Sequence, residues 1–228
     1  MNDIIVITGQ TATGKTKLAI EYAKSPSAGG NGELINADSR QVYKHLDIIT
    51  GKDLPMLQQS HVATYLFDIV EPSEPFSSYD YVRYVTPVIK NIWKRKKTPI
   101  LVGGTYFYIK CLLYGFDVTI PPNKKLREGL EKKSLKELQK IALHFINIMK
   151  QTNTLNQSDW NNPRRLIRKI EILKNGRTDA VEENPDVTSG DGKTAVGELG
   201  KIKMVGLKHK YREALVDAIT RRVDQRIA

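Results

Sequence analysis

The sequence has little sulfur and no long apolar run, and each shortage excludes a class of protein. The single cysteine, Cys111, cannot form an internal disulfide, and it lies in an apolar run, which is typical of a buried side chain. The one Cys and four His show no metal-ligand spacing. No apolar stretch approaches the ~20 residues of a membrane helix. No basic segment followed by a long apolar stretch opens the chain, so no signal peptide is predicted and a cytoplasmic location is expected.

Positive charge, in contrast, is in surplus. The 228 residues include 36 Lys and Arg but only 25 Asp and Glu, which gives a formal net charge of +11. Such a surplus favours a polyanionic partner, either nucleic acid or an anionic membrane surface. A merely basic surface explains the charge equally well, so the charge alone does not decide between them.

Strand-like and helix-like segments alternate along the first half of the chain. Short β-branched and apolar runs predict strands at 4–7, 34–37, 65–70 and 99–102, and a returning strand at 202–207. Helical spacing predicts helices at 15–24 and 77–97; a capping box opens the second, and Pro87 is expected to kink it or start a new turn. This alternation predicts an α/β fold of the P-loop NTPase type, with a parallel sheet flanked by helices.

The amino-acid composition of the sequence changes after Gly115. Residues 121–176 are polar, Lys-rich and helical in period; Pro163 suits the first turn of a helix and Gly176 its C-terminal cap. Residues 181–199 are expected to form a loop, and 212–228 a final helix. We therefore predict a core domain at 1–120, a small helical insertion domain at 121–180 and a return to the core at 181–228.

The strongest motif follows the first predicted strand and precedes the first predicted helix. It fits the pattern G-x-x-x-x-G-K-[ST] with Gly9, Gln10, Thr11, Ala12, Thr13, Gly14, Lys15 and Thr16. Glycines let the backbone wrap a phosphate, and the loop N–H groups and helix N-terminus point at it. Lys15 adds a positive charge, and the Thr16 hydroxyl is a candidate Mg²⁺ ligand. The pattern predicts a diphosphate or nucleotide site without saying which phosphate it binds.

An acidic residue ends the second predicted strand. Asp38 follows Ile35-Asn36-Ala37, and functional groups in such folds sit at the carboxyl ends of strands. Asp38 could instead cap the next helix. The polar Ser39-Arg40-Gln41 that follows is unusual for a plain turn and favours a catalytic role.

Several stretches together resemble the tRNA dimethylallyltransferase (isopentenyl-tRNA transferase) family, in the same order and over nearly the whole chain. They are the P-loop, Asp-Ser-Arg-Gln-Val-Tyr at 38–43, Thr-Gly-Lys at 50–52, Phe-Asp-Ile-Val-Glu-Pro at 67–72, Val-Gly-Gly-Thr at 102–105 with Tyr108, the basic stretch 162–171, and blocks at 205–207 and 222–225. The combination is far more specific than a P-loop alone.

The resemblance implies transfer of a dimethylallyl group from dimethylallyl diphosphate to N6 of the adenosine 3′ of the anticodon in tRNA. The P-loop would hold the leaving diphosphate with Mg²⁺, Asp38 would accept the proton, Thr105 would hydrogen-bond near the reacting centre, and Arg222, or its neighbour Arg221, would stabilise the diphosphate. The resemblance also implies contacts to the tRNA anticodon stem-loop from Asp38, Ser39, Arg40, Gln41, Thr105, Arg127, Arg164, Arg165, Leu166, Ile167 and Arg168. A monomer is expected.

Three departures from the family pattern stand out. Gln10 occupies the usual position of a Pro, and Tyr106-Phe107 replaces a Gly-Leu, which is expected to narrow the prenyl or base channel. Family members continue with further helices beyond the position of Ala228, so the chain is expected to be C-terminally truncated relative to them.

The basic stretch gives an independent argument for RNA. Residues 164–177 carry six Lys and Arg against one Glu, and Arg164, Arg165, Arg168 and Lys169 recur along one side of a helix. A solvated helix face is the plain alternative. Two other functions also fit parts of the sequence: a P-loop kinase of a nucleoside or small metabolite, with 121–176 as its lid, and an inactive RNA-binding remnant.

Overall fold

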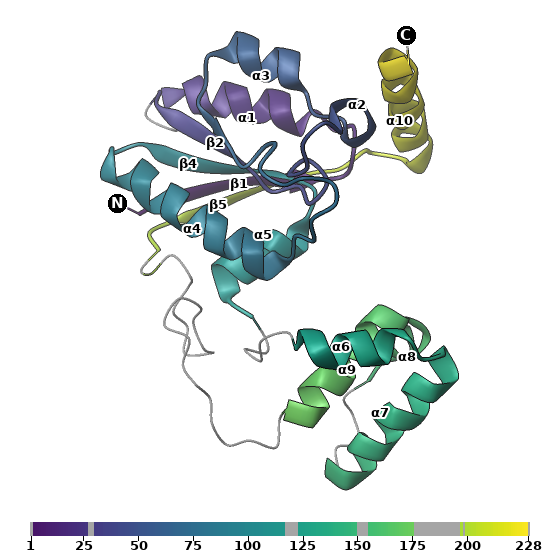
Figure 1. Cartoon of the computed structure of the whole chain (residues 1–228). Helices are drawn as coiled ribbons and strands as arrows, with labels where there is room; N and C mark the ends of the chain where they lie inside the picture. The colour runs from purple at the N-terminus through teal and green to yellow at the C-terminus, as the bar shows by residue number, and fades with distance from the viewer. Residues whose placement is uncertain are drawn as a thin grey trace. The chain divides into compact units, whose positions relative to one another are not determined.

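The computed structural model describes residues 2–26, 30–116, 123–149, 155–175, 197 and 199–227. Its internal contacts divide the chain into two compact units (Figure 1). The first comprises Met1–Gly115 and Pro185–Ala228, and the second comprises Phe116–Asn184.

A five-stranded parallel sheet forms the centre of the first unit. The strands are β1 (Ile4–Gly9), β2 (Gly32–Asn36), β3 (Thr64–Tyr65), β4 (Thr98–Gly103) and β5 (Ile202–Leu207), in the order β3-β2-β4-β1-β5. Every pairing is parallel. The three central strands are almost fully buried, which is why they read as continuous apolar runs in the sequence. The predicted α/β fold is confirmed.

Helices cover both faces of this sheet. The helices of this unit are α1 (Lys15–Lys24), α2 (Asp47–Thr50), α3 (Leu54–Ser60), α4 (Ser78–Lys94), α5 (Tyr106–Tyr114) and α10 (Arg212–Ile227), of which α2 and α10 lie at the carboxyl end of the sheet rather than on a face. Figure 1 shows α1 and α3 on one face and α4 and α5 on the other. On the first face Ile5, Ile7 and Leu34 pack against Ala19 of α1 and Leu57 of α3. No helix in the described part of the chain is long and apolar enough to cross a membrane.

The third strand differs from its prediction. A strand over 65–70 was expected, but β3 ends at Tyr65, because Leu66 and Asp68 adopt positive φ angles of 64° and 55° and turn the chain. Further along, Val70 makes only an isolated bridge with Tyr43. The apolar composition of residues 65–70 does not reveal the two left-handed residues within them.

Helix α4 begins as its sequence predicts. The Ser77 side chain accepts a hydrogen bond from the Asp80 backbone, and the Asp80 side chain accepts one from the Ser77 backbone, which completes the capping box. The helix then continues through Pro87 to Lys94 as one element. No new helix starts at Pro87.

The second unit contains four helices in the residues described: α6 (Lys124–Glu131), α7 (Leu135–Met149), α8 (Gln157–Asn161) and α9 (Pro163–Asn175). Helix α9 begins at Pro163, as predicted. The apolar side of α7 faces the core, where Leu138 and Ala142 pack against Leu166 and Ile170 of α9. The predicted cap at Gly176 and most of the predicted loop 181–199 lie outside the described residues.

A buried carboxylate stabilises the amino-terminal edge of the sheet. Glu33, at the start of β2, is 2% exposed and forms ion pairs with Arg95 and Lys97 and a hydrogen bond with Tyr65. Burial opposes ionisation, but the hydrogen bonds from Arg95, Lys97 and Tyr65 outweigh it and lower the pKa of Glu33 to about 2. This cluster links β2, β3 and the end of α4, and it lies at the edge opposite the candidate site.

Candidate active site at the carboxyl edge of the sheet

The phosphate-binding loop joins the end of β1 to the start of α1. Gly9 has a φ of 142°, and a Cβ there would lie 2.0 Å from the Leu207 carbonyl oxygen, so only glycine fits. Gly14 precedes α1 in a left-handed conformation, with no side-chain cap and no acidic residue in the first turn. The first N–H groups of α1 therefore stay available to an anion, and the positive end of the helix is not neutralised locally.

Lys15 lies among charged groups from distant parts of the chain. Its ammonium donates a hydrogen bond of 2.6 Å to the Gln10 carbonyl oxygen, which leaves further donors for a ligand. Burial lowers the pKa of Lys15, Asp38 and Asp53 raise it, and Arg222 lowers it. Lys15 is therefore in electrostatic range of two carboxylates and a second cation.

Gln10 attaches the loop to the segment after β5. Its side-chain oxygen accepts a hydrogen bond of 2.8 Å from the His209 backbone, and its own N–H donates to the Leu207 carbonyl. A proline at this position has no N–H to donate. Where the family usually has the rigid ring of a proline, Gln10 thus restrains the loop through two hydrogen bonds.

Asp38 lies at the end of β2, beside the end of β4. Its Oδ1 accepts a hydrogen bond of 2.9 Å from the Arg40 backbone. Its Oδ2 would be 3.6 Å from a Cβ on Gly104, which itself would be 3.8 Å from the Gly9 carbonyl oxygen. No donor in the described part of the chain hydrogen-bonds Oδ2. One carboxylate oxygen is therefore fixed and the other is free at the junction of three strand ends.

Thr105 joins the same two strand ends. Its hydroxyl oxygen accepts a hydrogen bond of 2.9 Å from the Ser39 backbone and donates one of 3.1 Å to the Ser39 hydroxyl. Its backbone N–H donates to the Ala37 carbonyl. The next two residues, Tyr106 and Phe107, begin α5 and are 53% and 56% exposed.

Arg222 approaches the loop from α10. Its guanidinium forms an ion pair of 2.8 Å with Asp53 and a hydrogen bond of 3.0 Å with the Gly51 carbonyl. Arg221 instead donates to the Asp217 carbonyl of its own helix. Of the two neighbouring arginines, Arg222 is the one directed toward the charged cluster.

Two residues near this cluster were not predicted as part of the site. Lys52 is buried and donates to the Tyr43 carbonyl, to Asp47 at 2.6 Å and to Asp68, so it holds the loop after Asp38 in place. Asp53 orients Arg222. Lys52 belongs to the Thr-Gly-Lys stretch that carries part of the family resemblance, but that stretch alone assigned it no role, and a pair separated by 169 positions leaves no local pattern in the sequence.

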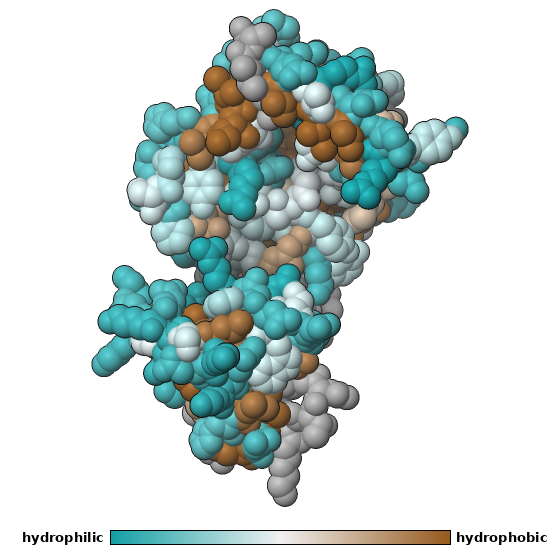
Figure 2. All heavy atoms as spheres, turned by 90° about the vertical axis from the view of Figure 1, so that its right-hand side faces the viewer, coloured by the Kyte–Doolittle hydropathy of each residue, from teal (hydrophilic) through white to brown (hydrophobic). Residues whose placement is uncertain are grey.

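Apolar side chains border the charged cluster. Ile48 and Ile49 of α2, just before Gly51, are 67% and 78% exposed, and Val223 beside Arg222 is 43% exposed. Figure 2 turns the α10 side of the unit toward the viewer and shows apolar patches within a hydrophilic surface.

The predicted tRNA contacts fall in two places. Asp38, Ser39, Arg40 and Thr105 lie at the carboxyl edge of the sheet, and the Gln41 amide donates to the Thr50 and Gly51 carbonyls. The other six belong to the helical unit and are Arg127, Arg164, Arg165, Leu166, Ile167 and Arg168.

Most of these six side chains already have partners within the helical unit. Arg127 and Arg168 both pair with the fully buried Glu171. Arg165 donates to Ser158 and lies 4.0 Å from Asp159. The side chains of Leu166 and Ile167 are buried in the core, and the Leu166 N–H donates to the Asn162 carbonyl, so neither side chain is open to a ligand. Arg164 is exposed.

The side chains around the loop suit a magnesium ion that is held mainly by the phosphates of a bound substrate. In the part of the chain that is described, no three His, Cys, Asp or Glu side chains cluster to hold a metal. Mg²⁺ commonly keeps several waters and binds through one or two protein groups and the phosphates of a substrate. Thr16 in the first turn of α1 supplies a hydroxyl in this position, so the residues present fit such an ion.

Residues 41–228 match the sequence model of the family described as IPP transferase. The chain belongs to this family. A relative from Treponema denticola, named tRNA dimethylallyltransferase 2, is 36% identical over 98% of this chain and 69% of its own length. Another from Endomicrobium trichonymphae, named tRNA dimethylallyltransferase, is 40% identical over 77% of this chain.

A solved member of the family has the same fold. The tRNA isopentenylpyrophosphate transferase from Bacillus halodurans is 30% identical, with a TM-score of 0.59 over 100% of this chain and 66% of its own. The match with the Endomicrobium relative spans 58% of that protein's length.

Proposed function

We propose that the chain transfers a dimethylallyl group from dimethylallyl diphosphate to N6 of the adenosine 3′ of the anticodon in tRNA. One observation carries the proposal: a carboxylate oxygen of Asp38, free of other donors, lies where the phosphate-binding loop, Thr105 and the ends of β1, β2 and β4 converge. The names of the relatives support this choice of substrates.

In this proposal the loop binds the diphosphate of the prenyl donor. The open N–H groups of α1, the Lys15 ammonium and the Arg222 guanidinium provide donors and positive charge for it. Arg222 uses only one of its terminal nitrogens with Asp53 and Gly51, so other N–H groups remain available. These groups stabilise the charge that develops on diphosphate as it leaves.

The transfer then exchanges one bond for another. The adenine N6 forms a bond to the allylic carbon, the bond between that carbon and the diphosphate oxygen breaks, and its electron pair leaves with diphosphate. The Asp38 Oδ2 accepts the proton that N6 loses. The bond from the Arg40 backbone holds the other oxygen, so the carboxylate is oriented before substrate arrives.

Thr105 acts mainly as a positioning residue in this scheme. Its two hydrogen bonds with Ser39 fix the chain directly after Asp38. Thr16, with diphosphate oxygens and water, would hold Mg²⁺, whose charge would further stabilise the leaving diphosphate.

The helical unit would face the tRNA. We propose residues 1–120 as core, 121–180 as a tRNA-facing insertion and 181–228 as the return to the core, a division that the clustering of contacts supports. Arg164 is the predicted tRNA contact in this unit whose side chain is most open to a phosphate. The chain would act in the cytoplasm, where tRNA is found, and as a monomer.

Analysis of the modified nucleoside tests the function. The chain is incubated with unmodified tRNA, Mg²⁺ and dimethylallyl diphosphate, and the RNA is digested for mass spectrometry. We expect one adenosine per tRNA to gain a dimethylallyl group. A parallel incubation with ATP and nucleosides tests the kinase alternative. Phosphorylated product without prenylated adenosine would overturn the proposal.

A further inference from the structure

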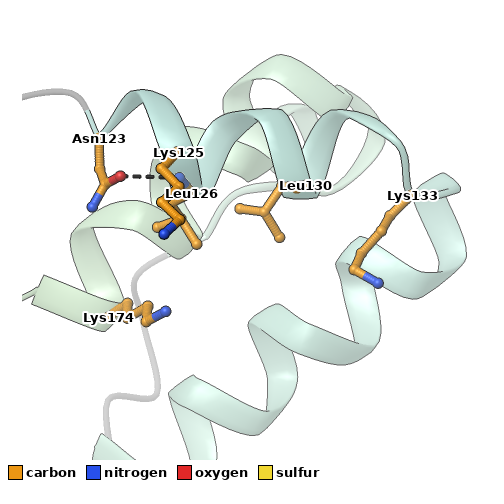
Figure 3. A pocket seen from close by; sticks show the side chains of 7 residues that line it. Asn123, Lys125, Leu126, Leu130, Lys133 and Lys174 are labelled. Carbon is orange, nitrogen blue, oxygen red and sulfur yellow. Dashed lines mark hydrogen bonds between the residues drawn. The ribbon is translucent and has the colours of Figure 1, made fainter.

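A basic hollow lies on the helical unit, away from the charged stripe on α9. It has a volume of about 420 Å³, and Lys125, Lys133 and Lys174 line it together with Leu126, Leu130 and Gly129. Figure 3 shows Leu130 and the end of Lys174 directed into the space beneath α6, with Lys133 at its far end. The hollow thus combines an apolar floor with three ammonium groups.

The three lysines differ from the arginines of the same unit. Within the described ranges, no carboxylate lies within 4.0 Å of any of them, whereas Arg127 and Arg168 are paired with Glu171. Lys133 is close to Glu137, but Ser134 hydrogen-bonds that carboxylate through both its backbone and its hydroxyl. Among the residues described, no ion pair therefore neutralises the hollow, although Lys133 is in electrostatic range of Glu137.

Positive charge is concentrated in the described residues of this unit. Residues 123–149 and 155–175 contain 12 Lys and Arg against five Asp and Glu, a net +7 of the total +11. Two of the five carboxylates, Glu171 and Asp159, are occupied by basic partners. The lysines of the hollow are thus among the charges left for an external anion.

We infer that this hollow is a second RNA-contact site, which binds consecutive phosphates of the tRNA backbone and one nucleoside face. Lys125 lies in the first turn of α6, which rises about 9 Å from there to its end at Glu131, and Lys133 lies beyond that end, so a polymer with repeated phosphates suits the two lysines better than one free phosphate. Lysine binds phosphate as a mobile point charge. Leu126 and Leu130 offer an apolar surface to a base or sugar. The inference rests on the proposed function, because it takes tRNA as the polyanion.

The test compares two triple variants with equal charge loss. K125Q/K133Q/K174Q removes the ammonium groups of the hollow, and K124Q/K132Q/K136Q removes three exposed lysines of the same unit that do not line it. Affinity for unmodified tRNA is measured across salt concentrations. For the first variant we expect the slope of log K against log salt to fall by about 0.7–0.9 per lysine. The control should change much less, and equal slopes and affinities for the two variants would overturn the inference.

A neutral variant tests the shape of the hollow. A Cβ on Gly129 would meet nothing within 4 Å, and leucine favours helix over glycine, so Gly129→Leu fills the hollow without strain on α6. We expect weaker tRNA binding at an unchanged salt slope, and wild-type affinity would count against the site.

The failure of this inference is distinguishable from that of the proposed function. If the wild-type chain prenylates tRNA and both triple variants bind alike, only the hollow is wrong. If the wild-type chain makes no prenylated adenosine, the proposed function is wrong, and the salt slopes still judge the hollow as an RNA site.

Discussion

Single residues from opposite ends of the chain form the diphosphate site. Lys15 lies in the first helix and Arg222 in the last, yet the charge of Arg222 helps to lower the pKa of Lys15. The sequence predicts Lys15 as a site residue through the local phosphate-loop motif. It predicts Asp38 as one because this acidic residue directly follows an apolar strand. It left Arg221 and Arg222 as alternatives, since only the packing of α10 on Gly51 and Asp53 separates them.

We therefore predict that the two arginines respond differently to substitution. Arg222→Ala should raise the Kd for dimethylallyl diphosphate by about 10- to 150-fold, since a hydrogen bond to a charged group contributes about 1.5–3 kcal/mol. Arg221→Ala, the matched control, should stay within about twofold, as expected for a surface residue. Calorimetric titration measures both constants. Equal losses in the two variants would contradict the assignment.

At the scale of elements, the sequence predicts long, regular segments best. Buried parallel strands appear as apolar runs and amphipathic helices as stripes, so β1, β4, α4 and α9 were predictable. The short helices α2 and α8 span less than two turns, too few residues to show a helical repeat of apolar positions. The early end of β3 depends on left-handed residues that no glycine marks.

Helix α9 depends on one buried carboxylate. Burial opposes ionisation of Glu171, but Arg127, Arg168 and the Asn123 backbone donate to it and lower its pKa. Because the folded pKa lies below the unfolded one, Glu171 stabilises the unit at neutral pH, and this contribution is lost as the pH falls through the folded pKa.

Glu171→Gln should therefore loosen the helical unit. Loss of charged hydrogen bonds at a buried site costs about 1–3 kcal/mol, which corresponds to amide exchange about 5- to 150-fold faster in α6 and α9. Hydrogen exchange with mass spectrometry measures this locally, and residues 2–116 serve as an internal reference. Glu128→Gln, an exposed change on α6, should leave exchange unaltered. Uniform acceleration in both variants would show that Glu171 has no special role.

At the scale of the whole molecule, charge and chemistry divide between the two units. The sheet unit brings Asp38, Lys15 and Arg222 together, whereas residues 123–149 and 155–175 of the helical unit carry a net charge of +7. The sequence alone located the surplus in residues 121–177 but not which of its charges are unpaired, because ion pairs such as those of Glu171 with Arg127 and Arg168 form only in the fold. In the proposed function, the sheet unit binds the prenyl donor and the helical unit binds the RNA acceptor.

The most direct test of this account is the single-turnover rate of dimethylallyl transfer by the wild-type chain and by Asp38→Asn. The amide is nearly isosteric but cannot accept the proton, so we predict a rate lower by about 10²–10⁴-fold. The Kd values for dimethylallyl diphosphate and tRNA should change little. A variant that transfers at the wild-type rate, or that regains it at high Mg²⁺, would contradict the claim that Asp38 is the base.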